Sequence, residues 1–228
     1  MSSPTASTEA ARARTRVGDR GTARGETERA IRRGAWPVTE TPAGRTTGWW
    51  GMLLFILTEA AMFACFIASY YYLRFSTDGP WPPVSDKLPH RIVPGIGTGI
   101  LVLSCLPMFA AVRTSRRSRA VTFPLLVLVT LAGTAFVVLQ AIDYLQEYPS
   151  STVSKDAYGS LLYTLTGLHA FHVGIGVLMM LLVLGSQLLR GLKKPQAAAT
   201  RVMSMYWYFL AILAVVIYFT VYLSPYIM

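Results

Sequence analysis

Long apolar runs separated by short polar stretches make up the chain from residue 49 onward. The runs occupy approximately Trp49–Leu73, Val93–Val112, Ala120–Leu145, Tyr158–Leu189 and Val202–Ile227. A helix needs about 20 apolar residues to cross a hydrocarbon core about 30 Å thick, because each residue adds about 1.5 Å. The runs are too long and too continuously apolar for barrel strands, which alternate apolar and polar residues over about 10 positions. The pattern predicts an all-α membrane protein, with a bundle of five transmembrane helices in residues 48–228.

The first 47 residues have a different composition. They hold nine of the 17 arginines and five of the 11 acids, with few large apolar side chains. Such a segment buries too little apolar surface to offset the entropy of ordering, which predicts a disordered tail. No apolar core of about 7–15 residues, as in a secretory signal, precedes Trp49. An Arg-rich targeting peptide is the alternative, although the scattered acids count against it.

Basic residues in the short loops indicate how the chain is oriented. The second and fourth loops, 113–119 and 190–201, each carry four basic residues and no acid, whereas acids balance the bases in the first and third loops. Because basic loops stay on the cytoplasmic side, we expect the tail inside and the C-terminus, Met228, outside. The net charge of +10 therefore reflects loops beside a membrane, and we expect no nucleic-acid partner.

Four ionisable side chains inside the apolar runs are costly to bury and are candidates for function, and three of them lie well inside the membrane. Glu59 lies about 15 Å into the first helix from its cytoplasmic end. His169 and His172 lie about 16 and about 21 Å into the fourth helix from its external end, so all three can share a depth. The two histidines also share one helical face. Glu59 has two open roles, proton relay or a structural hydrogen bond, and it is easier to bury when protonated or paired with a histidine.

Other polar and aromatic candidates lie near the helix ends. Gln140 and Asp143, three residues apart, share a face near the external end of the third helix. Asp143 either stands in water there or takes part in an intramembrane contact. Aromatic and basic side chains at helix ends are typical of contacts with lipid or a partner subunit. These candidates are Trp49, Trp50, Arg74, Tyr206 and Trp207.

Metal binding and catalysis by this chain alone have little support. His169 and His172 lie on one helix and the only other histidine, His90, lies in a loop, whereas two axial haem ligands normally come from separate helices. Cys65 and Cys105 lie inside apolar runs, where we expect small core residues and neither a disulfide framework nor a thiolate zinc site. We expect no catalytic residue, metal or cofactor in this chain.

Five segments carry a distinctive combination of residues. They are Trp49–Glu59, Tyr70–Arg74, Trp81–Pro83, Leu139–Tyr144 and Thr166–Val173. Together they resemble cytochrome c oxidase subunit III, in the five-helix bacterial form found in haem-copper oxidases. The last segment is close to the family's Thr-Gly-x-His-x-x-His-Val signature, and Asp143 stands where the family usually has Glu. In the fifth helix the chain departs from the family, with Tyr208 and Ala211 where His and Asp are usual.

The resemblance, which spans about residues 48–228, implies a non-catalytic accessory subunit in a bacterial plasma membrane. Such a subunit packs on catalytic subunit I and on subunit II, which hold the haem and copper. It also binds lipid and supports proton uptake and stability during aerobic electron transport. Quinol oxidases and nitric oxide reductases have similar subunits, so the electron donor and haem type stay open.

An independent transporter or proton channel is the alternative from another class, with Glu59, His169 and His172 as its pathway. Transporters commonly show internal repeats or helices broken at mid-membrane. The sequence has no convincing repeat, and Pro107 and Pro124 are its candidate kinks.

Overall fold

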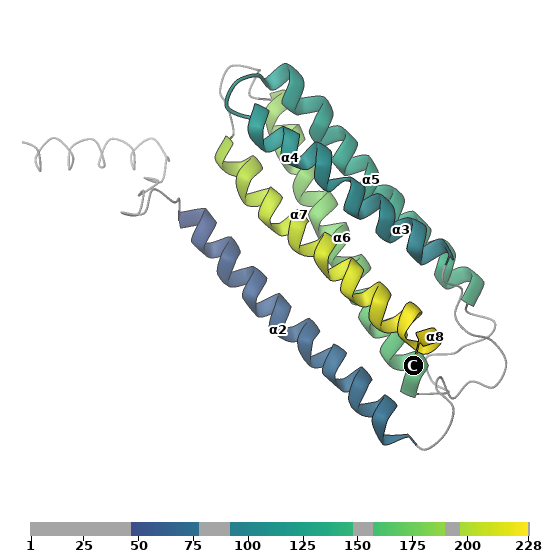
Figure 1. Ribbon diagram of the computed structural model, residues 1–228. Coiled ribbons are helices and arrows are strands. Elements are labelled where there is room, and N and C mark those ends of the chain that lie inside the picture. Colours follow the sequence, from purple (N-terminus) through teal and green to yellow (C-terminus); the bar gives the residue numbers. More distant parts are fainter. Residues whose placement is uncertain (1–46, 78–91, 148–156, 190–196, 228) are drawn as a thin grey trace, which may run out of the picture. The chain divides into compact units, whose positions relative to one another are not determined.

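The computed structural model describes residues 47–77, 92–147, 157–189 and 197–227. The described elements, in chain order, are α2 (Thr47–Ser76), α3 (Ile92–Leu103), α4 (Cys105–Thr114), α5 (Arg119–Glu147), α6 (Ala157–Leu189), α7 (Ala197–Ile217), the π-helix η1 (Tyr218–Leu223) and α8 (Ser224–Ile227) (Figure 1). The predicted tail lies outside the described residues apart from Thr47, as do Trp81–Pro83 and His90.

Five helical segments are long and apolar enough to cross a membrane. They are Thr47–Ser76, Ile92–Thr114, Ala120–Leu145, Tyr158–Leu189 and Ala197–Leu223. A lipid core forces each span to satisfy its own backbone hydrogen bonds, which a helix does completely. The predicted all-α fold with five transmembrane helices is confirmed.

The core lies where α5, α6 and α7 meet the shorter helices. α5 packs against α3, α4 and α6, and α7 packs against the same three helices. Space is tight at Gly133 of α5, where an added Cβ would lie 2.5 Å from Cη2 of Trp207 and 2.8 Å from Cγ2 of Val177. A glycine is therefore required for the indole ring of Trp207 to fit between the helices, as small residues commonly allow in membrane bundles.

α2 joins the other helices through a few long side chains. Phe63 and Tyr70 are its buried residues, and they pack in a cluster with residues of α6, α7 and η1 such as Leu165 and Val221. Only 6% of the most apolar window of α2 is buried, against 50% for α7. Cys65 is exposed on this helix, so its prediction as a core residue is wrong. Most of the apolar surface of α2 therefore faces outward, towards lipid or another subunit.

Two departures from regular helix occur close to prolines. The second span divides at Ser104, between α3 and α4, three residues before Pro107. A proline ring crowds the carbonyl of the residue four positions earlier and has no N–H to bond it, which weakens the helix at that point. In the last span the N–H of Ser224 bonds the carbonyl of Phe219, five residues back, just before Pro225. α5, by contrast, runs without interruption through its own proline.

Candidate functional site

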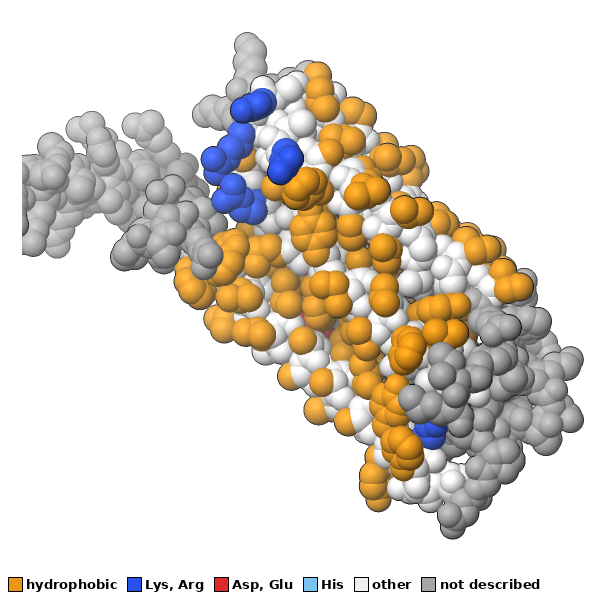
Figure 2. All heavy atoms as spheres, viewed as in Figure 1, with side chains coloured by type: hydrophobic (Ala, Val, Ile, Leu, Met, Phe, Trp, Pro, Cys, Tyr) orange, Lys and Arg blue, Asp and Glu red, His pale blue; other side chains and the backbone are white. Residues whose placement is uncertain are grey.

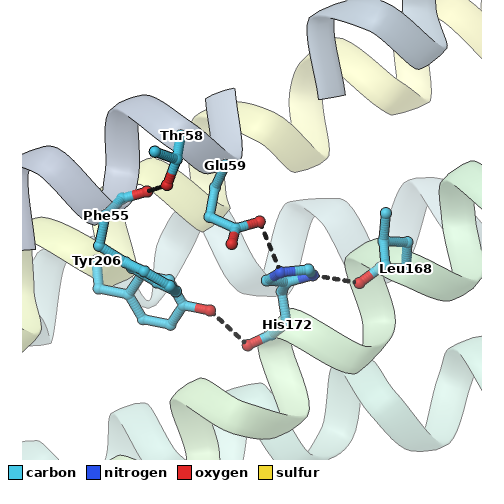
Figure 3. Close-up of polar contacts among 6 residues, drawn as sticks. All are labelled: Phe55, Thr58, Glu59, Leu168, His172 and Tyr206. Carbon is cyan, nitrogen blue, oxygen red and sulfur yellow. Dashed lines mark hydrogen bonds and ion pairs between the residues drawn. The ribbon is translucent and has the colours of Figure 1, made fainter. Parts of the chain in front are cut away.

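A polar pair joins α2 to α6 among apolar side chains (Figure 3). Oε2 of Glu59 lies 2.9 Å from Nε2 of His172, and the two side chains are 17% and 7% exposed. On the other side of the imidazole, Nδ1 lies 2.7 Å from the carbonyl oxygen of Leu168. A carbonyl oxygen only accepts hydrogen bonds, so Nδ1 carries a hydrogen and donates it. This leaves Nε2 as the nitrogen that faces Glu59.

With Nδ1 of His172 donating to Leu168, one proton held between Oε2 of Glu59 and Nε2 of His172 would join the two side chains. Either a protonated Glu59 donates to Nε2, or a doubly protonated His172 donates to the carboxylate. The two arrangements contain the same number of protons and have the same net charge of zero. A neutral pair is far less costly inside a membrane than a lone carboxylate. The structure thus brings together two of the three ionisable residues that the sequence places at one depth.

Aromatic side chains surround this pair. The ring centroid of Phe63 lies 5.5 Å from that of His172, with the rings edge to face. The hydroxyl of Tyr206 donates to the backbone carbonyl of His172 at 3.2 Å, and its ring lies 5.8 Å from that of Phe55 (Figure 3). Tyr206 is fully buried, so its prediction as a lipid or interface contact is wrong. Its hydroxyl has an acceptor on α6, which allows the side chain to turn inward.

Trp207 is also fully buried, and the prediction of a lipid or interface contact is wrong for it too. Its Nε1–H donates to Oγ of Ser104 at 2.9 Å, next to the break between α3 and α4. A buried indole needs such an acceptor. At the start of α2, by contrast, Trp50 is 40% exposed and its ring meets that of Trp49 edge to face at 4.9 Å.

A second polar cluster is built around Asp143 of α5, which is only 1% exposed. Its Oδ2 accepts from Nε2 of Gln140 at 3.4 Å and from the hydroxyl of Tyr222 in η1 at 3.1 Å. Nearby, the hydroxyls of Tyr144 and Thr166 lie 2.7 Å apart and link α5 to α6. The alternative in which Asp143 stands in water at a helix end is therefore wrong, since the last span covers it.

His169 belongs to neither cluster. It is 3% exposed, and the rings of Phe63 and Phe136 lie 6.5 and 5.4 Å from its own. Within the described part of the chain, neither of its ring nitrogens has a hydrogen-bond partner.

The last turns of the chain hold contacts that the sequence reasoning missed. Arg74, near the end of α2, donates from Nη1 to Oγ of Ser224 at 2.6 Å and from Nη2 to its carbonyl at 3.3 Å. Ser224 thus contacts α2 through Arg74, and Tyr222 contacts α5 through Asp143. Polar side chains at the end of a strongly apolar run were the available signal for both.

The two departures from the family pattern lie in the core around Trp207. Tyr208 packs against this core, and its hydroxyl is buried without a hydrogen-bond partner among the described residues. Ala211 is 4% exposed. Among the residues that the structure describes, no three His, Cys, Asp or Glu side chains come together as a group suited to a metal ion.

Five spans with polar pairs between them define a multi-pass membrane protein, and comparison with known proteins gives its family. The family model described as cytochrome c oxidase subunit III matches residues 29–226. Cytochrome c oxidase subunit 3 of Pelomedusa subrufa is 27% identical over 198 residues, which cover 84% of this chain and 75% of the relative. The Drosophila yakuba protein of that name is 30% identical over 180 residues, 76% of this chain and 68% of the relative.

A bacterial relative has a similar likeness. The probable cytochrome c oxidase subunit 3 of Mycobacterium leprae is 28% identical over 174 residues, which cover 75% of this chain and 85% of the relative. The chain belongs to the cytochrome c oxidase subunit III family. It is an accessory subunit of a haem-copper oxidase and associates with that complex.

Proposed function

We propose that this chain packs on catalytic subunit I and on subunit II of a respiratory oxidase in a bacterial plasma membrane. There it stabilises the complex during turnover, contacts lipid and supports proton uptake. The observation that carries the proposal is the family match over residues 29–226. The outward apolar side chains of α2, among them Leu54, Leu57 and Phe75, support a face that meets lipid or a neighbouring subunit.

The haem and copper of such an oxidase belong, in this proposal, to the partner subunits. The imidazole of His172 does not fit either group, because Glu59 and the carbonyl of Leu168 face its two nitrogens. His169 is a single buried donor between two phenylalanine rings, and a haem or copper centre needs several ligands. Within the described residues, the ionisable pair that this chain contributes is Glu59–His172, which links α2 to α6.

Purification of the tagged chain in a mild detergent tests the proposal. We expect it to copurify with polypeptides that contain haem and copper, and these polypeptides identify the electron donor and the haem type. A chain that runs alone, with no haem absorbance and no companion subunit, would contradict the proposal and favour an independent transporter.

We also propose that residues 1–47 lie in the cytoplasm and that the C-terminus lies outside. Basic side chains gather at one end of the face seen in Figure 2. Among the described residues at the cytoplasmic helix ends are Arg113 in α4, Arg116 and Arg117 in the turn after it, and Arg201 near the start of α7. Basic residues concentrate on the cytoplasmic side of membrane proteins.

Labelling of single cysteines with an impermeant reagent tests this orientation, in a chain whose Cys65 and Cys105 are first replaced by serine. A cysteine placed at 78–87 should react from the external side, and one placed at 190–196 only from the cytoplasm. The reverse pattern would show that the orientation is wrong.

A further inference from the structure

A small pocket with several polar groups in its lining lies beside His169, between α3, α5, α6 and the end of the last span. Its volume is about 20 Å³, and most of its lining surface is apolar. The lining residues that carry polar groups are Thr98, Gln140, Thr166, His169, Tyr218 and Tyr222. A polar space of about 10–15 Å³ or more is enough for one water molecule. The pocket therefore has room for a single water and little room for a larger ligand.

His169 is the group in this pocket that lacks a partner. A neutral imidazole has one N–H donor and one nitrogen acceptor, and neither is bonded among the described residues. The side chain is 3% exposed, so bulk solvent does not satisfy it. Phe63 and Phe136 pack against the ring and offer no strong hydrogen bond. An unpaired polar group at this depth is unfavourable, and ordered water is the usual remedy.

The surrounding hydrogen bonds offer further partners for a molecule in the pocket. The Thr166 hydroxyl donates to the carbonyl of Leu162 and accepts from Tyr144, which leaves it one lone pair, and Gln140 already bonds Asp143. Thr166 can therefore accept from a water, and Gln140 has both a further hydrogen and lone pairs to offer. A buried water typically makes about three hydrogen bonds, which matches one bond each to His169, Gln140 and Thr166.

We propose that this pocket holds one structural water, which bridges the imidazole of His169 to Gln140 and Thr166. The water connects His169 to the Asp143 cluster, so that α5, α6 and η1 are held by one continuous set of hydrogen bonds. His169 and His172 then have separate roles on one helix face. His172 faces Glu59 of α2, and His169 is satisfied by the water in the pocket.

Thermal unfolding of the intact complex tests the proposal through two substitutions of His169. His169→Met is close in volume but makes no strong hydrogen bond, so it should lower the unfolding temperature of this subunit by about 2–8 °C. His169→Gln keeps a donor and an acceptor and should lower it less. Leu165→Met is the matched control, because Leu165 is 1% exposed one turn away on α6. If the pocket is dry, His169→Met removes an unpaired polar group, and an unchanged or raised unfolding temperature would overturn the proposal.

A map of the unsubstituted oxidase complex gives a direct second measurement that does not depend on whether the variants fold. At a resolution that shows ordered waters, we expect density for one water within hydrogen-bond distance of His169. An empty pocket, in a map that shows waters elsewhere in this subunit, would overturn the proposal. The unfolding temperature and the water density both report on the interior of this chain. A negative result in either therefore leaves its membership of the oxidase complex unaffected.

Discussion

Replacing Glu59 with glutamine or leucine separates the polar contact of the Glu59–His172 pair from the carboxyl group itself. In Glu59→Gln the amide nitrogen can donate to Nε2 of His172, because Nδ1 already donates to the carbonyl of Leu168. In Glu59→Leu the same nitrogen faces an apolar side chain. We therefore expect the glutamine variant to keep the link between α2 and α6 and the leucine variant to lose it.

The burial of the pair sets the size of the effect. An interhelical hydrogen bond in a membrane contributes about 0.6–2 kcal/mol, and a buried polar group left unpaired costs about 1–3 kcal/mol. With exposures of 17% for Glu59 and 7% for His172, water can replace little of the lost bond. We expect Glu59→Leu to cost about 1–3 kcal/mol and Glu59→Gln less than about 1 kcal/mol. At about 2–4 °C per kcal/mol, these are falls of about 2–12 °C and less than about 4 °C in unfolding temperature.

The assay is thermal unfolding of the assembled complex, together with the amount of this subunit that stays bound during purification. Thr58→Val is the matched control, since the Thr58 hydroxyl is exposed and bonds only its own helix, at the carbonyl of Phe55. Haem absorbance should be the same in all variants. A leucine variant as stable as the parent would refute the reasoning, and a glutamine variant as unstable as leucine would show that the carboxyl group itself is required.

Three further experiments test the packing around these clusters, each by unfolding temperature in the complex. Tyr222→Phe removes a donor to Asp143 and should cost about 1–2 kcal/mol, so an unchanged value would contradict the contact. Gly133→Ala should cost about 1–3 kcal/mol because its Cβ meets Trp207, whereas Gly99→Ala, with open space around it, should cost little. The losses of stability caused by Trp207→Phe and Ser104→Ala should be non-additive in the double variant, because both remove the same hydrogen bond. Simple additivity of the two losses would argue against that hydrogen bond.

The number of spans follows from the sequence, because the thickness of a membrane fixes how many apolar residues a helix needs. The common depth of Glu59 and His172 follows from the same residue count, since the two helices cross the same hydrocarbon layer. Contact between them needs one thing more, the rotation of each helix about its axis.

Helix rotation is what the hydrophobic pattern could not give. In a membrane protein the lipid-facing and the buried faces are both apolar, so hydropathy does not tell which side turns inward. Tyr206 and Trp207 stand near the start of the last span, as interfacial aromatics do, yet both turn into the core to reach acceptors on α6 and at Ser104. The wide turn before Pro225, which holds Tyr222 against Asp143, has no hydrophobic signature either.

The central claim is that this chain supports a haem-copper oxidase without carrying its redox centres. The most direct measurement compares the purified complex with and without this subunit for haem and copper content and for activity over repeated turnovers. The account predicts the same haem and copper per complex and a similar initial rate, followed by a faster loss of activity when the subunit is missing. A stoichiometric loss of haem or copper together with the subunit would contradict it.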